Sequence, residues 1–578
     1  MAEIVVTAVI LGSFFLIWPV GHYTIEDDWA YAQSLLILHE SGEVRILQWN
    51  PMTLVTHLFW GLLFTKTLGF SFTVTKISVV VMLWFECLLL IAVLRHVGAR
   101  EPWIVLASLA LLLNPLHLFQ GFLYGTDVPA AAWGLLALLG YLRGLTARPI
   151  SWPWIVAGSF GVAMGWGIRQ SGILVAAALG AYLLFHDRKR LFDLRFLLAA
   201  FLLPGLAIVG FSGWYFLIHG PTVMFERSRQ DVLNTLLGLG APSALAMLYC
   251  LSAYLAFLAL PVLLAVPWSS YRPRWGSPRG IATVTASVAV MGLFGWLTWG
   301  VHLRFPYLRN KITQFGLLSP NEILVGDRPV LWSSTVGWVV SGVLCLGVVA
   351  LILLLTRRPE EDDPGETRTV ARRLIGWLFC LQGIYAFLTQ GILFDRHLLL
   401  FLPTILLLIV LAVPTRVRAR PILAALCLGL YGFYGIATTH DLHAMSRRAF
   451  ELGTDLMQEG VDAQQIDAGS AFDGWHMHAR SWAETRFHRQ PSLARPGDGV
   501  WVHMLTPRLV TRYVVSLSPR LSPQNWAHGV APWARSYVAL PRLQDYRVVR
   551  EESWFSYWPW GERPIYVLED RRLSADDG

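Results

Sequence analysis

Three consecutive acidic residues, Glu26, Asp27 and Asp28, follow the first apolar run of the chain. Neighbouring carboxylates repel one another, which raises the pKa of at least one of them, and a carboxylate can act as a general base. The alternative is structural, because an aspartate at the start of a helix over residues 28–40 caps the backbone and complements the helix dipole. One aspartate can also cap while the other acts, so Asp27 and Asp28 are both candidate catalytic residues.

A fourth acid, Asp127, opens a later apolar run in the segment 124–129 (YGTDVP). It too can be interpreted as a helix N-cap, with Pro129 in the first turn. The topology derived below places Asp127 on the same external face as Asp27 and Asp28. Two acidic sites on one surface suit an acid/base or cation-linked role, so Asp127 is the third candidate catalytic residue.

Two cationic motifs have the chemistry to bind an anion. Arg169 and Gln170 lie in a short hairpin between two apolar runs, and Arg396 and His397 begin another run. An arginine at membrane depth is costly and is usually functional or paired, and a guanidinium binds phosphate through paired hydrogen bonds. The structural alternatives are a snorkelling Arg169 and a local Asp395–Arg396 pair. We take these four residues as candidate phosphate-binding residues: Arg169, Gln170, Arg396 and His397.

Two further groups of charged or titratable residues are weaker candidates. Arg304, Arg309 and Lys311 lie on one external loop, where the expected partner is a lipid head group. His476 and His478 alternate in a run interpreted as a strand, on which they would share one face. No third ligand follows at a convincing spacing, so no metal site is predicted, and a requirement for a divalent cation is left open.

The composition is that of a membrane protein. Of the 578 residues, 55% are hydrophobic and 15% are charged, and the mean hydropathy is +0.51, whereas soluble domains carry about 25% charged residues. The net charge of +8 lies in short basic clusters between apolar runs, as in membrane proteins, so no nucleic-acid partner is expected. All five cysteines lie within apolar runs, which argues against disulfides and zinc–thiolate sites.

Because a membrane-spanning helix needs about 20 apolar residues, the apolar runs predict about thirteen transmembrane helices. They lie near residues 4–20, 73–94, 103–119, 128–142, 152–167, 171–185, 196–218, 244–267, 281–300, 333–355, 374–392, 398–414 and 422–437. No basic residue precedes the first run, so a retained span is expected there rather than a cleaved signal. The short, densely basic loops should be cytoplasmic. The N-terminus is then cytoplasmic, and the external segments are the loops 21–72, 219–243 and 301–332 and the tail.

The chain is expected to have two domains, a transmembrane domain over 1–437 and an external α/β domain over 438–578. Within the first external loop, 21–72, the segments 28–40 and 53–68 have mixed polar and apolar faces, which is typical of helices in the membrane interface. The tail should contain a helix over 441–459 and strands at 499–504, 512–517, 545–550 and 565–569.

Four short segments, in this order, resemble one enzyme family: 27–34 (DDWAYAQS), 124–129 (YGTDVP), 168–172 (IRQSG) and 395–403 (DRHLLLFLP). Together they resemble the bacterial GT-C glycosyltransferases, nearest to the protein O-mannosyltransferase-like glycosyltransferase family 39 and its lipid A aminoarabinose-transferase relatives. The segments 60–74 and 469–476 fit the same group.

The resemblance implies a polytopic α-helical membrane enzyme of GT-C type in the bacterial cytoplasmic membrane. Such an enzyme moves a sugar from a polyprenyl-phosphate donor to an acceptor on the outer face. The family's catalytic acid maps onto Asp27 or Asp28, and its second aspartate maps onto Asp127. The sequence departs from the family at Tyr124-Gly125, where Phe-Met is commoner, and at His397, where the family often has tyrosine.

The chemistry of such a transfer agrees with the residues. An acceptor hydroxyl needs a general base, and the departing phosphate gains charge that fixed arginines stabilise, so Asp27 or Asp28 with Arg169 or Arg396 supplies both halves. A single in-line attack predicts inversion at the sugar carbon. The sugar, a hexose or a pentose, and the acceptor, an envelope glycolipid, polysaccharide or protein, stay open.

Two other functions are compatible with a multi-pass chain. A transporter or flippase of lipid-linked sugars often shows inverted repeats and charges near mid-membrane, whereas this sequence shows no repeat and places its acids at the external surface. A non-catalytic assembly protein whose tail binds envelope polymers would need no acid pair in the first loop. The sequence therefore favours the glycosyltransferase.

Overall fold

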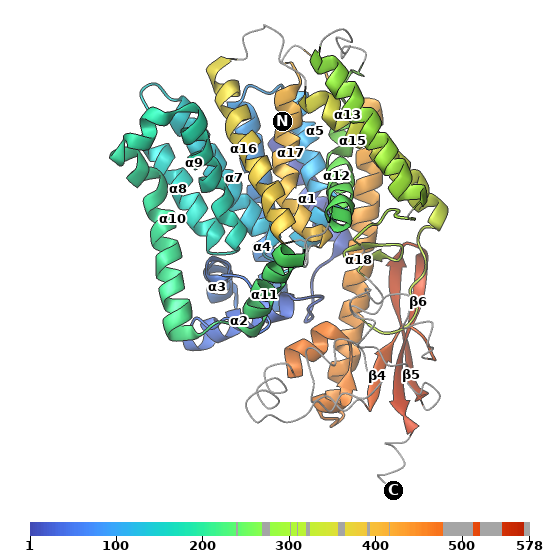
Figure 1. The fold of residues 1–578 in the computed structure, drawn as a ribbon. Coiled ribbons are helices and arrows are strands. Elements are labelled where there is room, and N and C mark those ends of the chain that lie inside the picture. Colours follow the sequence, from blue (N-terminus) through green and yellow to red (C-terminus); the bar gives the residue numbers. More distant parts are fainter. Residues whose placement is uncertain are drawn as a thin grey trace.

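The computed structural model describes residues 1–238, 241–268, 278–300, 302–308, 310–318, 324–356, 365–389, 394–414, 417–477, 512–520 and 546–571. Helices dominate and gather into one bundle, with a small sheet beyond one end of it (Figure 1). The N-terminus lies at the opposite end of the molecule from the C-terminus (Figure 1).

The bundle is built from helices whose bounds follow the apolar runs. In chain order they are α1 (Ala2–Ile17), α4 (Phe72–His96), α5 (Glu101–Leu112), α6 (Pro115–Gly121), α7 (Asp127–Thr146), α8 (Trp152–Trp166), η1 (Gln170–Ile173), α9 (Leu174–His186), η2 (Arg188–Phe192), α10 (Leu194–Trp214), η3 (Tyr215–His219), α12 (Ala241–Leu264), α13 (Pro278–Gly295), η5 (Trp296–Gly300), α15 (Ser334–Leu355), α16 (Gly365–Leu388), η7 (Asp395–Phe401), α17 (Leu402–Ala412) and α18 (Pro421–Gln458).

Each of the thirteen predicted spans overlaps a helix or a pair of consecutive helices, so the multi-pass architecture is confirmed. In the described part of the chain, seven helices are long and apolar enough to cross a membrane, or eight if the bent α5–α6 pair counts as one span. The others are shorter or more charged. α8, for example, has 15 residues, or about 22 Å at 1.5 Å per residue, against a hydrocarbon core of about 30 Å. The count of thirteen stays a prediction.

The predicted span at 103–119 is broken into two helices, α5 and α6, which are bent by 67°. The break lies at Asn114-Pro115. Pro115 has no N–H to continue the helix, and it disfavours helical backbone at the residue before it. The Asn114 side chain accepts a hydrogen bond from the backbone N–H of Leu116 at 3.2 Å and so caps α6. As a result α6 leads directly into the loop before Asp127.

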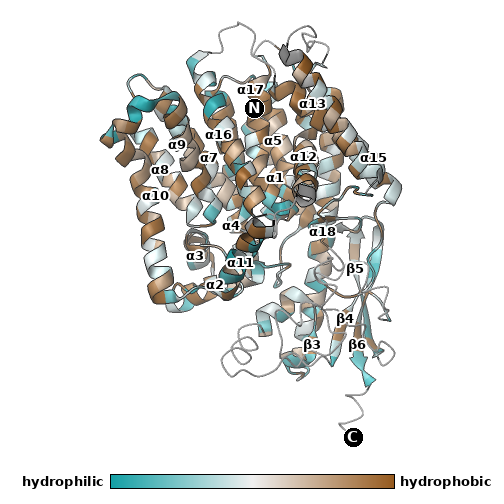
Figure 2. Ribbon diagram, in the orientation of Figure 1, coloured by the Kyte–Doolittle hydropathy of each residue, from teal (hydrophilic) through white to brown (hydrophobic). Residues whose placement is uncertain are grey.

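The spanning helices differ in how far they are covered by protein. The most apolar window of α12 is 78% buried inside the molecule, whereas that of the α10 segment is 17% buried. α12 therefore packs in the interior of the bundle and α10 faces outward, with hydrophobic residues on its surface (Figure 2). A long apolar helix exposed in this way requires lipid around it.

Short helices lie at the end of the bundle nearest the sheet (Figure 1). α2 (Asp28–Ser41) and α3 (Val55–Leu68) confirm the two helices predicted for the first loop. α11 (Val223–Gly238) was not predicted and occupies the segment expected to be a loop. Its first turn is fastened to the first loop, because the N–H of Met224 donates to the carbonyl of Gln48 at 3.2 Å and Thr222 Oγ1 donates to the carbonyl of Asn50 at 2.7 Å.

The tail combines the end of α18 with a sheet of order β3-β4-β6-β5. The strands are β3 (Ile466–Asp467), β4 (Tyr513–Ser516), β5 (Tyr546–Tyr557) and β6 (Trp560–Asp570), with the short helix η8 (Ala463–Gln465) before β3 and a separate hairpin of β1 (Ile312–Thr313) and β2 (Gly316–Leu317) between α13 and α15. β3 runs parallel to β4, and the other pairs are antiparallel.

The strands predicted at 512–517, 545–550 and 565–569 are present, while the one at 499–504 lies outside the described residues. The predicted helix over 441–459 is the second half of α18, which runs without a break through the predicted domain boundary at 437/438.

Candidate functional site

The two predicted acids at the start of α2 do not cap that helix. Asp27 precedes its first residue, yet no side-chain hydrogen bond caps the first turn. Asp27 Oδ1 instead accepts a hydrogen bond from the indole N–H of Trp49 at 2.9 Å. Asp28 Oδ1 accepts from the backbone N–H groups of Ile25 and Glu26 at 3.0 and 3.1 Å, upstream of the helix. Asp27 therefore lies at the N-cap position and Asp28 in the first turn, but neither side chain makes the expected capping hydrogen bond.

Asp28 is the buried member of the pair. It is 2% exposed, and its Oδ2 has no hydrogen-bond partner among the described residues. Burial raises the pKa of Asp28, an effect opposed by the nearby Lys76 ammonium. That ammonium donates to the carbonyl of Tyr23 at 2.9 Å. Asp28 and Lys76 together shape the turn that presents Glu26 and Asp27.

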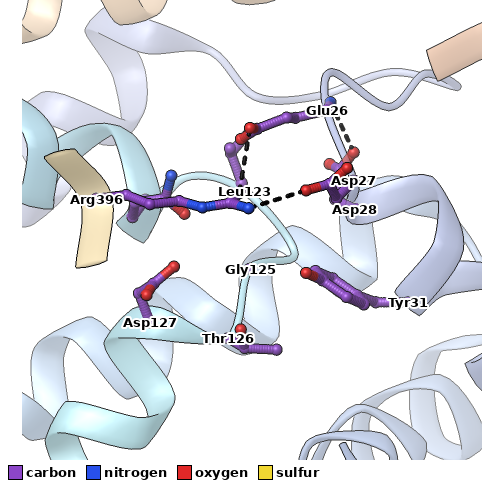
Figure 3. Close-up of a pocket in the computed structure, with 10 residues that line it drawn as sticks. Glu26, Asp27, Asp28, Tyr31, Leu123, Gly125, Thr126, Asp127 and Arg396 are labelled. Atoms are coloured by element: carbon purple, nitrogen blue, oxygen red, sulfur yellow. Dashed lines mark hydrogen bonds and ion pairs between the residues drawn. The ribbon is translucent and has the colours of Figure 1, made fainter. Parts of the chain in front are cut away.

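Arg396 lies between two acids of the first loop. Its Nη1 contacts Glu26 Oε1 at 3.2 Å and its Nη2 contacts Asp27 Oδ2 at 3.1 Å. Figure 3 shows the guanidinium reaching toward both carboxylates, with Asp127 and Tyr31 on the other side of the small hollow that these groups surround. The structural alternative for Arg396, a local ion pair with Asp395, is not formed.

Asp395 and Lys311 complete this side of the cluster. The buried Asp395 carboxylate accepts hydrogen bonds from the backbone N–H groups of Lys311 and Ile312, at 2.9 to 3.0 Å. This contact holds the β1–β2 hairpin in place, and the Lys311 ammonium then forms an ion pair with Glu26. Lys311 is buried, so the expectation that it faces lipid head groups is wrong.

Asp127 and Arg169 form the second ion pair of the cluster. Asp127 is the first residue of α7, and again no side-chain hydrogen bond caps the helix. Arg169 Nη1 also contacts Thr126 Oγ1 at 3.3 Å. Gln170 Nε2 donates to the carbonyl of Pro51 at 2.9 Å, which ties this hairpin to the first loop. Arg169 is thus paired across the site rather than snorkelling to the surface.

The cluster lies at one end of a cavity of about 950 Å³. Asp27, Asp127, Arg169, Gln170, Arg396 and His397 all line it, so six of the seven predicted site residues share one chamber; Asp28 lines only the adjoining hollow of about 10 Å³. The rest of the wall is largely apolar. α11 contributes one part of it, and most of the apolar part comes from α7, α9, α16 and the η7–α17 segment, with Ala130, Ala131, Gly134, Leu135, Leu138, Leu174, Val175, Leu378, Leu388, Leu399, Leu400, Pro403 and Leu407.

His397 has a structural contact as well as a place on the wall. Its Nδ1 accepts a hydrogen bond from the backbone N–H of Phe394 at 3.3 Å, which closes the first turn of η7. This bond helps to orient the imidazole, which also lines the cavity.

The tail reaches the site through the segment after β3. Residues 470–477 are helical, and Ser470 lines the cavity. The Gln33 amide of α2 donates to the carbonyl of Trp475. Gly474 packs on the Trp29 ring so closely that a Cβ there would lie 2.3 Å from a ring atom, so only glycine allows this approach. His476 therefore lies on a helix rather than the expected strand, and His478 lies outside the described residues.

Among the described residues, no group of three or more His, Cys, Asp and Glu side chains is arranged to hold a metal ion. The cavity-facing carboxylates of the cluster instead pair with cations of the protein: Glu26 with Arg396 and Lys311, Asp27 with Arg396, and Asp127 with Arg169.

Two parts of the site were missed by sequence reasoning. Lys311 was assigned to the lipid surface, although its place on an external loop beside the first-loop acids was a usable signal. α11 supplies a wall of the cavity that includes Met224, Phe225, Arg227 and Arg229. Its alternation of charged and apolar residues over 223–238 is the pattern of an interfacial helix.

The fold and the site define a multi-pass helical membrane protein with an ionic cluster at the head of a largely apolar cavity. No protein-family model matches the chain, and a search of curated proteins found no match. Among solved structures, the chain is similar to ArnT from Cupriavidus metallidurans bound to undecaprenyl phosphate. The identity is 13% and the TM-score 0.39, with 98% of this chain and 97% of that one covered. It is also similar to the archaeal oligosaccharyltransferase AglB from Archaeoglobus fulgidus, in complex with an inhibitory peptide and a dolichol-phosphate. There the identity is 16% and the TM-score 0.44, with 92% of this chain and 72% of that one covered.

Proposed function

We propose that this chain is a glycosyltransferase that moves a sugar from a polyprenyl-phosphate donor to an acceptor at the external face of the cytoplasmic membrane. The external face is the one on which the first loop and the tail lie, with the N-terminus in the cytoplasm. The sugar is a hexose or a pentose, and the acceptor is an envelope glycolipid, a polysaccharide or a protein.

One observation carries the proposal: a single cavity joins a charged head to an apolar groove. Arg169 and Arg396 lie at the head, and the side chains of α7, α9, α16 and α17 line the groove. A polyprenyl-phosphate sugar has the same division, with an anionic phosphate next to the sugar and a long apolar chain behind it. The phosphate fits at the arginines, which bind such groups by paired hydrogen bonds, and the chain fits along the groove.

Asp27 is better placed than Asp28 to act as the general base. Asp27 lies on the cavity wall and is 25% exposed, whereas Asp28 is buried and uses one oxygen to hold its own turn. A base must lie within hydrogen-bond reach of the hydroxyl that it deprotonates. The indole of Trp49 fixes one oxygen of Asp27 and leaves the other toward Arg396 and the cavity.

The transfer is a single displacement. The acceptor oxygen forms a bond to the anomeric carbon while the bond from that carbon to the phosphate oxygen breaks, and its electron pair leaves with the polyprenyl phosphate. Asp27 takes the acceptor proton. The phosphate changes from a diester to a monoester and gains charge, so arginines at the head of the cavity bind it more tightly in the transition state and lower the barrier. Attack from one side inverts the sugar carbon.

Donor binding also activates the base in this scheme. Without donor, Arg396 is shared by Glu26 and Asp27. A donor phosphate competes for the same guanidinium and weakens its contact with Asp27. The Asp27 oxygen that faced Arg396 can then accept the proton of an acceptor hydroxyl.

The test is sugar transfer by the full-length protein in native membranes, from a panel of labelled undecaprenyl-phosphate sugars. Wild type is compared with Asp27→Asn, which keeps the shape and the contact with Trp49. We expect one donor to be used and the variant to lose about 10³-fold in kcat, within the range for a general base. Glu569→Gln, a carboxylate change in the tail sheet, is the matched control and should transfer normally.

Two outcomes would contradict the proposal. Full transfer by a folded Asp27→Asn variant would remove Asp27 from the chemistry. The absence of transfer from every donor, with lipid-linked sugar crossing vesicles that contain the protein, would favour a flippase instead.

A further inference from the structure

The turn of the β5–β6 hairpin is aromatic and partly exposed. The two strands pair antiparallel as far as Tyr557 and Trp560, so Trp558 and Pro559 form the turn. Trp560 is 75% exposed, and its ring stacks beside Tyr557 with centroids 5.7 Å apart. A large apolar ring displayed at the tip of a hairpin marks a contact surface when it joins a larger apolar region.

The turn is held against α18 by contacts with two adjacent residues of that helix. Asp441 accepts hydrogen bonds from Ser556 Oγ at 2.8 Å and from the backbone N–H groups of Tyr557 and Trp558 at 2.6 and 3.1 Å. The His440 ring stacks on Tyr557 with centroids 3.5 Å apart. The hairpin runs alongside α18 (Figure 1), and these contacts prevent its turn from swinging away.

The part of α18 that holds the turn comes directly after an exposed apolar face of this helix. Ile422, Leu426, Leu430 and Phe433 recur every three or four residues, which places them on one face of the helix, and each is more than half exposed. α18 is one of the helices able to span a membrane. The ring of Trp558 packs on Phe433 with centroids 5.3 Å apart, so the turn continues this lipid-facing surface outward.

A second helix marks the same depth. Tyr434 stacks on Trp332 with centroids 5.2 Å apart and contacts Trp558 at 6.0 Å. Trp332 comes just before α15, which is also able to span a membrane. Tryptophan and tyrosine collect where a span leaves the hydrocarbon, because their rings are apolar and their N–H or O–H groups are polar.

We propose that the turn of the hairpin, Tyr557–Trp560, lies in the lipid head-group region of the leaflet next to the tail, with Trp560 as the inserted side chain. The partner is the bilayer surface. The far end of the hairpin stays in water, because Arg550 there pairs with Glu459 and Asp455 at the outer end of α18. The tail thus has a second attachment to the membrane besides α18, and this inference does not depend on the proposed transfer reaction.

The test places an environment-sensitive fluorophore on Trp560→Cys in the full-length protein, reconstituted into phosphatidylglycerol–phosphatidylethanolamine vesicles. The matched control is Val549→Cys, an exposed position on β5 about 25 Å further along the strand at 3.3 Å per residue. The unsubstituted chain corrects for labelling of its own cysteines. We expect spin-labelled lipids to quench the probe at position 560 severalfold more than the probe at position 549.

The ring of Trp560 contacts Phe555 and Tyr557 within the hairpin, so a second measurement keeps an aromatic side chain at position 560. A photoreactive phenylalanine derivative at position 560 should form adducts with phospholipid on irradiation, detected by mass spectrometry, and the same group at position 549 should not. Equal quenching at the two positions, or an adduct at position 560 with a second copy of the chain in place of lipid, would overturn the proposal.

Discussion

Glu569 in the tail sheet and Asp27 at the cavity each face an arginine, yet their surroundings differ. Glu569 Oε2 accepts from Arg547 at 2.7 Å, and its Oε1 accepts from Arg512 at 3.3 Å and from Tyr513 at 3.0 Å. Tyr513 and Arg547 lie opposite Glu569 on the two neighbouring strands, and Arg512 directly precedes Tyr513, so sheet register brings these residues together. Asp27 and Arg396 are 369 residues apart in the sequence and form their ion pair on the wall of a cavity.

This difference in surroundings separates an ion pair that stabilises the fold from one that can take part in a reaction. Glu569 does not line the cavity, so a substrate bound there cannot reach its carboxylate. Asp27 and Arg396 lie where a substrate can displace one from the other. An ion pair therefore indicates a functional site only where a cavity lies beside it. The following experiments test this distinction between the two ion pairs.

After Asp27→Asn, the largest effect is expected from Arg396→Lys, which keeps the charge but loses the planar fork that reaches Glu26 and Asp27 together. We expect about a 100-fold loss in kcat for sugar transfer, as for removal of one preorganised donor. The matched change in the tail, Arg547→Lys, should alter transfer less than twofold. A similar loss of kcat in Arg396→Lys and Arg547→Lys would mean that the cavity ion pair and the sheet ion pair do not differ in function.

An intermediate effect is expected from filling the apolar groove at Gly134. A Cβ there would meet only Val175, at 4.0 Å, so Gly134→Leu adds bulk to the cavity without a backbone clash. We expect KM for a long-chain undecaprenyl-phosphate donor to rise about tenfold, the cost of a lost apolar contact, and KM for a short-chain analogue to change little.

The matched control for the groove is Gly180→Leu on α9, where a Cβ meets nothing within 4 Å and which is outside the cavity lining. An unchanged KM for both donors in Gly134→Leu would show that the prenyl chain lies elsewhere.

A smaller effect, on stability alone, is expected from Glu569→Gln. Burial by itself raises the pKa of Glu569, but hydrogen bonds from Arg547, Tyr513 and Arg512 outweigh it, and the pKa is lowered. A carboxyl with a lowered pKa stabilises the fold above its unfolded pKa of about 4.3, and this contribution is lost as pH falls through the folded pKa. Wild type should therefore lose thermal stability below about pH 4.

The variant should be less stable than wild type at neutral pH and should lack that part of the acid dependence. Thermal unfolding followed by tryptophan fluorescence from pH 7 to pH 3 measures both, with transfer activity at pH 7 as the second readout. Parallel curves for the two proteins would mean that the ion pairs of Glu569 do not stabilise the sheet.

The smallest effect is expected from chelation of divalent cations. The three cavity-facing carboxylates of the cluster already have cationic partners in Arg169, Arg396 and Lys311. We expect EDTA to change the transfer rate less than twofold. A rate that collapses in EDTA and returns with Mg²⁺ would mean that a cation displaces one of these partners during turnover.

The sequence identified the members of the ionic cluster because charged residues stand out at the ends of apolar runs. Asp27, Asp127, Arg169 and Arg396 were found this way, and the topology placed them on one face. Their pairing was not predictable, because it depends on which helices pack side by side. The local alternatives, an N-cap for Asp127 and a pair between Arg396 and its sequence neighbour, were wrong for this reason.

Burial was the second quantity that the sequence could not supply. Asp27 and Asp28 are adjacent and chemically identical, yet one lines the cavity and the other is buried beside Lys76. Only the path of the turn before α2 separates them. The same limit applies to α11, because an amphipathic segment does not reveal which groove it covers.

The continuity of α18 bears on how such a protein can change over evolutionary time. Its 38 residues form a rod of about 57 Å at 1.5 Å per residue, and the last turns of the membrane segment are also the first turns of the tail. Exchange of the tail by recombination near residue 437 would join two half-helices in an arbitrary rotational phase. Such an exchange would also remove the contact between Gly474 and the ring of Trp29, which lies close to Asp27 in the sequence. The tail and the bundle are therefore expected to be inherited together, as one unit.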